Sequence, residues 1–192
     1  VGRVSKEKNL HVLAKAFADL AASTERSLQL VVVGDGPFLT EMKNMLANSP
    51  AIFTGYMQGK ELSSIYASSH VFVFPSTTDT FGNVVLEAQA SGLPVITTDK
   101  GGPQENILPD RTGFVVKAND VQSLSQSMRI LAENAELQQK MKAAARNYAE
   151  KRGFSEAFSK LYDMYVSERA AETPQQESHP FVCVGEHLTP VA

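Results

Sequence analysis

The sequence predicts an α/β fold: a Rossmann-like, doubly wound parallel sheet with helices on both faces. Short apolar runs rich in β-branched residues, such as 28–33 and 94–98, indicate buried strands. Amphipathic stretches with helical spacing separate these runs along most of the chain. Because strands that alternate with helices pair in parallel through right-handed crossovers, an open doubly wound sheet follows.

Strands and helices are expected to alternate in chain order. The expected strands are residues 28–33, 52–56 (a short strand and turn), 71–74, 94–98 and 112–116. The expected helices are residues 9–22, 38–48, 61–69, 82–91, 121–133, 135–151 and 155–169, with Asp120 as an N-cap. Residues 1–170 are expected to form one domain, and the polar residues 171–192 a linker or tail.

Composition limits the classes of function. The 192 residues carry a net charge of −3, with 43% hydrophobic and 20% charged residues, which is ordinary for a globular protein. No broad basic surface for nucleic acid is indicated. The single cysteine, Cys183, excludes an internal disulfide and forms no metal-ligand cluster with the four histidines. No apolar run approaches the roughly 18 residues of a membrane span. We therefore expect a cytoplasmic location, which still allows peripheral docking on the inner face of a membrane.

Two cations near the start of the chain, Arg3 and Lys8, flank an expected turn at residues 4–7. A guanidinium donates two parallel hydrogen bonds to an anion, and an ammonium acts as a point charge, so the two residues are candidates for binding a diphosphate. The alternative, which spacing alone leaves open, is that both are solvated turn residues.

Two glycine-rich turns follow expected strands. The turn 34–37 lies between a strand and a helix, which makes Gly36 a candidate for contact with a nucleotide. A tight turn with Pro37 at the first helical position is the alternative. Gly101 and Gly102 present two unhindered amides that could approach a sugar or a phosphate, and plain turn chemistry is again the alternative.

The most informative stretch, residues 75–92, continues from the strand 71–74 as a loop and a helix. The first helical amides, at 82–85, have no acceptor inside the helix and lie at its positive end, which favours a phosphate. Glu87 lies one turn further along, and its two acceptor oxygens suit the vicinal diol of a ribose. Asp79 lies in the loop and could accept hydroxyls from another part of the same ligand.

The candidate residues share an expected location. Ligands of open parallel sheets bind beyond the carboxyl ends of the strands. Four separate loops are expected at that edge, and they contribute Arg3, Gly36, Asp79 and Gly101.

The spacing Asp79-x7-Glu87, within Asp-Thr-Phe-Gly-Asn-Val-Val-Leu-Glu-Ala, resembles the E-x7-E signature of the group 1 (family 4) retaining glycosyltransferases of GT-B fold. Asp79 stands where most members carry Glu. The resemblance covers about residues 1–165 and implies the C-terminal, donor-binding domain of such an enzyme, with its first strand truncated. It also implies a missing N-terminal acceptor domain of the same protein as a partner, without which these residues are inactive.

The same resemblance implies roles for individual residues. The pattern Gly-Arg-x4-Lys assigns Arg3 and Lys8 to the two phosphates, while Glu87 binds the ribose and Asp79 the sugar hydroxyls. The residues implied to contact the rest of the donor are Gly36, Tyr56, Met57, Phe81, Gly82, Asn83, Val84, Gly101 and Gly102. Packing of Tyr56 in the core is the alternative to its role in binding the base. No D-x-D carboxylate pair is present, so neither a metal nor another cofactor is expected.

The resemblance implies transfer of a hexose from a nucleoside-diphosphate sugar to a lipid or saccharide acceptor. The sequence variant around Asp79 is most similar to that of mannosyl- and related hexosyltransferases. Two alternatives remain: a GT-B nucleotide-sugar epimerase or phosphorylase, and a non-catalytic nucleotide-sugar-binding domain. The departure at Asp79 is compatible with the second.

Overall fold

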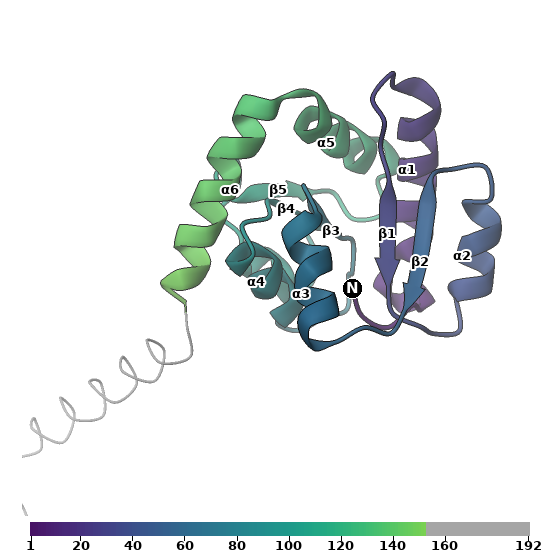
Figure 1. The fold of residues 1–192 in the computed structure, drawn as a ribbon, viewed down its shortest axis with the longest axis horizontal. Coiled ribbons are helices and arrows are strands. Elements are labelled where there is room, and N and C mark those ends of the chain that lie inside the picture. The colour runs from purple at the N-terminus through teal and green to yellow at the C-terminus, as the bar shows by residue number, and fades with distance from the viewer. Residues whose placement is uncertain (153–192) are drawn as a thin grey trace, which may run out of the picture. The chain divides into compact units, whose positions relative to one another are not determined.

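The computed structural model describes residues 1–152, in which five strands alternate with helices (Figure 1). The strands are β1 (Leu30–Val33), β2 (Ala51–Gly55), β3 (Phe72–Phe74), β4 (Val95–Thr98) and β5 (Gly113–Val116). The α-helices are α1 (Leu10–Ser23), α2 (Leu39–Met45), α3 (Gly59–Ser68), α4 (Asn83–Ala90), α5 (Val121–Glu133) and α6 (Ala135–Glu150). Two short 3₁₀ helices are η1 (Lys6–Lys8) and η2 (Gly102–Asn106). The predicted α/β fold class is confirmed.

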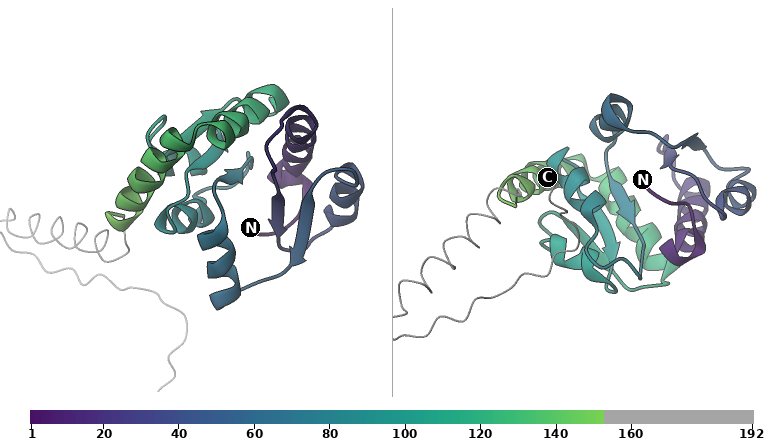
Figure 2. Two further views of the ribbon diagram at one scale, coloured as in Figure 1. Left: turned by 45° about the horizontal axis from the view of Figure 1, so that its top comes forward. Right: turned by 90° about the horizontal axis from the view of Figure 1, so that it is seen from below.

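All pairs of neighbouring strands are parallel, but they form two sheets rather than the single one predicted. β1 pairs with β2, and β4 pairs with both β3 and β5. The expectation of one continuous sheet is wrong for residues 1–152, because no strand of this part of the chain lies between β1 and β3. Figure 2 shows β1 and β2 beside α1 and α2, separated from the group formed by β3 to β5.

Apolar residues cover both faces of the three-stranded sheet. Alternate side chains of a strand point to opposite faces: Val73 packs with one apolar cluster, and Phe72 and Phe74 with the other. The first cluster joins the sheets to α1, α2 and α5, and the second joins β3 and β4 to α3 and α4. Helices therefore pack on both faces, as predicted for a doubly wound fold.

Several predicted boundaries shift by a few residues. The strand predicted at 28–33 begins at Leu30, and the helix predicted at 38–48 is the shorter α2 followed by turns. Pro37 is not the first helical residue, because α2 begins at Leu39. Asp120 caps α5 as predicted, accepting a hydrogen bond of 2.9 Å from the Ser123 amide. The predicted helix 155–169, the boundary at 170 and the tail 171–192 lie outside the described residues.

None of the helices within residues 1–152 combines the length and the apolar character that crossing a bilayer requires.

The apolar cluster under α5 gives a direct test of the packing. Leu124 is 1% exposed on this helix, so Leu124→Ala should lower the free energy of unfolding by about 2–5 kcal/mol through lost burial and a residual cavity. Gln126→Ala, on the exposed side of the same helix, should change it by no more than about 0.5 kcal/mol. Chemical denaturation measures both, and equal effects of the two changes would contradict this packing.

Candidate functional site

The first residues of the chain lie against the turn that follows β1. The Gly2 amide donates to the Val33 carbonyl over 2.9 Å, and the Val4 amide donates to the Asp35 carbonyl over 2.8 Å. A Cβ atom at Gly36 would lie 2.3 Å from the carbonyl oxygen of Val4. Gly36 is therefore required for close contact between two backbone segments, which places the Arg3 segment at the carboxyl end of the sheet.

Lys8 and Asp79, 71 positions apart in the sequence, form an ion pair at this edge. Their side chains are 25% and 22% exposed, and the Lys8 ammonium also lies 5.8 Å from the centre of the Phe74 ring. The pair uses Asp79 Oδ1, while Oδ2 is buried without a hydrogen-bond partner. Both residues were predicted as ligand contacts, but their contact with each other was not predicted from the sequence.

The loop that carries Asp79 is held from two further sides. The Thr78 hydroxyl donates to the Glu7 carbonyl over 3.3 Å, and the Gly102 amide donates to the Asp79 carbonyl over 2.9 Å. Side chains would not fit at the two glycines: a Cβ atom at Gly101 would lie 2.8 Å from the Asp79 carbonyl oxygen, and one at Gly102 would lie 1.7 Å from that of Thr80. Gly101 and Gly102 thus permit loop-to-loop packing, whatever else they contact.

The loop ends at the N-terminus of α4. Gly82 is the N-cap, with a φ of 77° in the left-handed region, and no side chain caps the helix. The amides of Asn83 and Val84 have no acceptor inside the helix, which leaves them and the positive end of the helix dipole for an anion. Phe81 lies directly before this turn with 54% of its surface exposed.

Two buried amide side chains, those of Asn106 and Gln89, position that turn. Neither role was predicted from the sequence. Asn106 Nδ2 donates to the Phe81 carbonyl over 2.5 Å, and Gln89 Nε2 donates to the Asn106 carbonyl over 2.6 Å. Gln89 is fully buried on α4. In the sequence, its position next to the apolar Ala88 could have indicated that this long polar residue is buried. Removing either partner would leave a buried polar group unsatisfied.

Glu87 lies one turn into α4 and is exposed. Its Oε2 atom accepts a hydrogen bond of 3.2 Å from the hydroxyl of Tyr66, a residue that is only 5% exposed. Burial, and then the nearby Glu87 carboxylate, raise the pKa of Tyr66. The Glu87 carboxylate therefore lies beside α3, which carries Tyr66.

The candidate base contacts lie beyond β2. Tyr56 is 77% exposed, so the alternative in which it packs in the core is wrong. The Gly34 amide donates to the Gly55 carbonyl over 2.7 Å, which places Tyr56 and Met57 beside the turn that follows β1. The Arg3 side chain is on the surface and forms no ion pair with any residue from 1 to 152. In the same part of the chain, no three His, Cys, Asp or Glu residues group as metal ligands.

Together these features define a Rossmann-like domain with charged residues and a helix N-terminus at the carboxyl edge of its parallel strands, the usual arrangement for binding nucleotides. The family model described as "Glycosyl transferases group 1" matches residues 1–148. The chain belongs to this family.

Curated relatives extend well beyond the matched region. The sulfoquinovosyl transferase SQD2 of Arabidopsis thaliana is 37% identical over 164 residues, which cover 84% of this chain and 31% of the relative. A GDP-mannose-dependent alpha-mannosyltransferase of Mycolicibacterium smegmatis is 44% identical over 116 residues, covering 60% of this chain and 29% of the relative. The chain thus spans about a third of the length of these relatives.

Solved structures share the fold, which is that of GT-B glycosyltransferases. The catalytic domain of cholesterol-alpha-glucosyltransferase from Helicobacter pylori aligns with a TM-score of 0.72 at 24% identity, over 80% of this chain and 96% of that one. Anabaena Alr3699/HepE in complex with UDP and glucose aligns with a TM-score of 0.73 at 20% identity, over 87% of this chain and 47% of that one.

The ion pair between Lys8 and Asp79 should stabilise the fold measurably. A double-mutant cycle with Lys8→Ala and Asp79→Ala should give a coupling free energy within about 0.5–3 kcal/mol, the range for residues in direct contact. The matched control is the pair Lys140–Glu136 on α6, whose side chains are 72% and 79% exposed. Exposed pairs at this spacing contribute about 0.3–0.5 kcal/mol.

Both couplings come from denaturant unfolding of the four variants in each cycle. A Lys8–Asp79 coupling no larger than that of the α6 pair would show that the contact does not connect the two loops.

Proposed function

We propose that this chain contains the donor-binding domain of a retaining glycosyltransferase that works without a metal and transfers a hexose from a nucleoside-diphosphate sugar. The observation that carries the proposal is the convergence of Arg3, Lys8, Asp79 and the N-terminus of α4 at one edge of the sheets. Family membership across residues 1–148 supports it.

The diphosphate is the part of the donor that these charges suit best. The uncapped amides at the start of α4 donate to one phosphate, and Arg3, on the surface and unpaired within residues 1–152, binds the other. Lys8 contacts Asp79 and is therefore placed to interact with the same diphosphate. As the glycosidic bond breaks, negative charge grows on the leaving diphosphate, and these fixed positive groups stabilise it without a metal ion.

The two acids bind opposite ends of the donor in this proposal. Glu87 accepts the hydroxyls of the ribose, with its orientation fixed by the hydrogen bond from Tyr66. The buried, unpartnered Oδ2 atom of Asp79 accepts a hydroxyl of the transferred sugar. Tyr56 and Met57 contact the base, and the 77% exposure of Tyr56 leaves its ring available for stacking. Neither acid acts as a nucleophile.

Similar proteins differ in the nucleotide that their names or structures carry. One relative is named as GDP-mannose-dependent, whereas the fold neighbour from Anabaena was solved with UDP and glucose. In this proposal an acceptor domain of the same protein completes the enzyme and chooses a lipid or saccharide acceptor, and relatives about three times as long as the matched part leave room for such a domain. A thermal-shift panel of UDP-, GDP- and ADP-sugars identifies the nucleotide, because a ligand that binds the native state raises its melting temperature.

The ribose contact predicts the effect of changing Glu87. Glu87→Gln keeps the shape of the side chain but replaces a charged acceptor, worth about 1.5–3 kcal/mol in a hydrogen bond. The Kd for the nucleoside diphosphate whose sugar binds best in the panel should therefore rise about ten- to a hundredfold. Calorimetry measures this, with Glu61→Gln on the exposed surface of α3 as the control.

If Glu87→Gln binds the nucleotide as tightly as Glu61→Gln does, Glu87 is not the ribose contact.

The charge of Arg3 predicts a selective effect. Arg3→Ala removes a cation placed for the second phosphate, so it should weaken binding of the nucleoside diphosphate more than binding of the matching monophosphate, by about tenfold or more. Arg111→Ala, another exposed arginine in the loop before β5, should leave both affinities unchanged. Equal losses for diphosphate and monophosphate would exclude the proposed role.

A further inference from the structure

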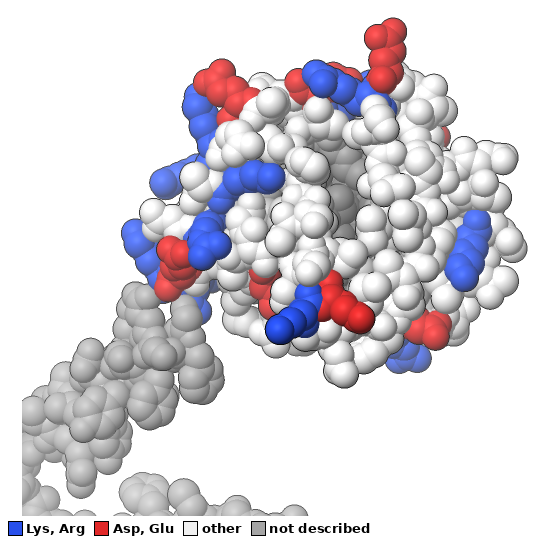
Figure 3. Space-filling view, in the orientation of Figure 1, with Lys and Arg blue, Asp and Glu red and all other residues white. Residues whose placement is uncertain are grey.

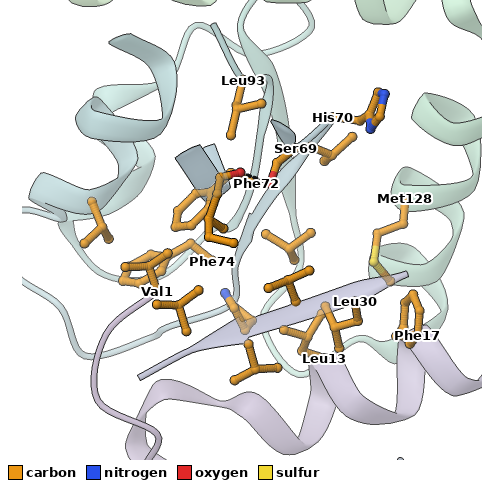
Figure 4. A pocket seen from close by; sticks show the side chains of 18 of the residues that line it. Val1, Leu13, Phe17, Leu30, Ser69, His70, Phe72, Phe74, Leu93 and Met128 are labelled. Atoms are coloured by element: carbon orange, nitrogen blue, oxygen red, sulfur yellow. Dashed lines mark hydrogen bonds between the residues drawn. The ribbon is translucent and has the colours of Figure 1, made fainter. Parts of the chain in front are cut away.

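The turn at residues 80–82, which leads into α4, is positioned by the 3₁₀ helix η2. The turn lines a cavity of about 910 Å³, whose walls also include Phe72, Phe74 and Leu93 (Figure 4). It packs directly on η2, because a Cβ atom at Gly82 would lie 2.9 Å from Cγ of Pro103. The position of the uncapped amides at the start of α4 therefore depends on η2.

Asn106, the last residue of η2, holds the turn through its side chain and is only 1% exposed. Its Nδ2 atom donates to the Phe81 carbonyl over 2.5 Å, and its Oδ1 atom accepts from the Arg152 guanidinium over 3.3 Å. A carbonyl oxygen only accepts and a guanidinium only donates. Turning the amide over would therefore set acceptor against acceptor at Phe81 and donor against donor at Arg152. Arg152 thus favours the orientation of Asn106 that bonds to the turn.

Arg152, which lies just beyond α6, is itself held in place. Its amide donates to the Ala149 carbonyl over 3.0 Å, and its guanidinium lies 4.7 Å from the centre of the Tyr148 ring. The guanidinium and the Tyr148 hydroxyl both donate to the Glu105 carbonyl of η2, over 3.3 and 3.4 Å. Because a planar cation stacked on a ring has little freedom left to lose, these contacts keep Arg152 pointed at η2.

Other basic residues of α6 make a different kind of contact. Several basic side chains lie over α6 in Figure 3. Arg146 pairs with Glu150, and Lys140 pairs with Glu136, each four positions apart on the same helix and with both partners exposed. Pairs of this kind contribute little to stability. Arg152 instead connects the end of α6 to a residue 46 positions earlier in the sequence.

We propose that Arg152 is a positioning residue for the anion site. Through Asn106 it holds the Phe81 carbonyl, and with it the turn that presents the amides of Asn83 and Val84. The proposal rests on the proposed function, in which these amides bind a phosphate of the donor. Arg152 makes no contact with the donor, so its removal weakens phosphate binding without removing a group that touches the ligand.

Calorimetry on this chain tests the proposal, with the nucleoside diphosphate whose sugar binds best in the thermal-shift panel. Arg152→Ala should raise its Kd about fivefold or more, because affinity falls with the fraction of molecules whose turn is in the binding position. Arg146→Ala removes an exposed cation of the same helix and should change the Kd by less than about twofold. Arg152→Lys keeps the charge but not the planar fork, so it should recover only part of the loss.

A second pair of variants tests whether Arg152 acts through its partner. In an Asn106→Ala background, the further change Arg152→Ala should alter the Kd by less than about twofold, because the link is already broken. A loss of the same size in both backgrounds overturns the proposal. Full recovery by Arg152→Lys also overturns it, because the charge alone would then account for the effect.

Hydrogen exchange without ligand tests the link even if Asn106→Ala does not fold. The buried Val85 donates its amide to the Gly82 carbonyl over 2.9 Å. Arg152→Ala should speed exchange at this amide about threefold or more through local opening of the turn. The Leu124 amide, which bonds at the start of α5, is the reference and should not change.

Equal exchange rates at Val85 in the wild type and in Arg152→Ala overturn the proposal. A wild-type chain that binds none of the nucleoside diphosphates contradicts the proposed function instead, and faster exchange at Val85 then still supports the link from Arg152 to the turn.

Discussion

The contact between Lys8 and Asp79 connects the segment before α1 with the loop after β3, and the geometry of the site depends on it. Around it, Thr78 bonds to Glu7, and the Gly102 amide bonds to the carbonyl of Asp79. Three loops that are far apart in the sequence are thereby fixed in one place. The pair also balances the Lys8 charge in this structure, so an arriving anion competes with Asp79 for the ammonium rather than meeting an isolated cation.

Glycine makes this convergence sterically feasible. At Gly36 and Gly102, a Cβ atom would overlap the carbonyl oxygens of Val4 and Thr80. These positions bring backbone close to backbone, whereas at Gly82 a left-handed φ turns the chain into α4 and leaves the first helical amides uncovered. The same residue type thus serves two purposes: it packs the loops together and it presents an anion-binding helix end.

Periodicity and motif spacing predict much of this molecule. The alternation of apolar runs and amphipathic stretches predicts the strands and helices, with boundaries that shift by a few residues. It does so because burial of one face imposes a different repeat of apolar residues on a strand and on a helix. The spacing of Asp79 and Glu87 places them on a loop and the helix that follows, as observed.

Contacts between distant residues were not predictable: the pairing of Lys8 with Asp79, and of Tyr66 with Glu87, depends on how the helices pack on the sheets. The buried Gln89 and Asn106 were missed because each has a polar side chain that only its tertiary partner explains. Alternation alone does not predict the split between β1 and β3, because it predicts only the strands that are present.

A diphosphate bound at the N-terminus of α4, with the ribose on Glu87, is the interaction on which the proposed function depends. A crystal structure of this chain with the nucleoside diphosphate that raises its melting temperature most tests that interaction directly. We expect phosphate oxygens within hydrogen-bond distance of the Asn83 and Val84 amides and of Arg3, with the ribose hydroxyls on Glu87. A nucleotide bound elsewhere, or one whose ribose faces away from Glu87, would contradict the proposal.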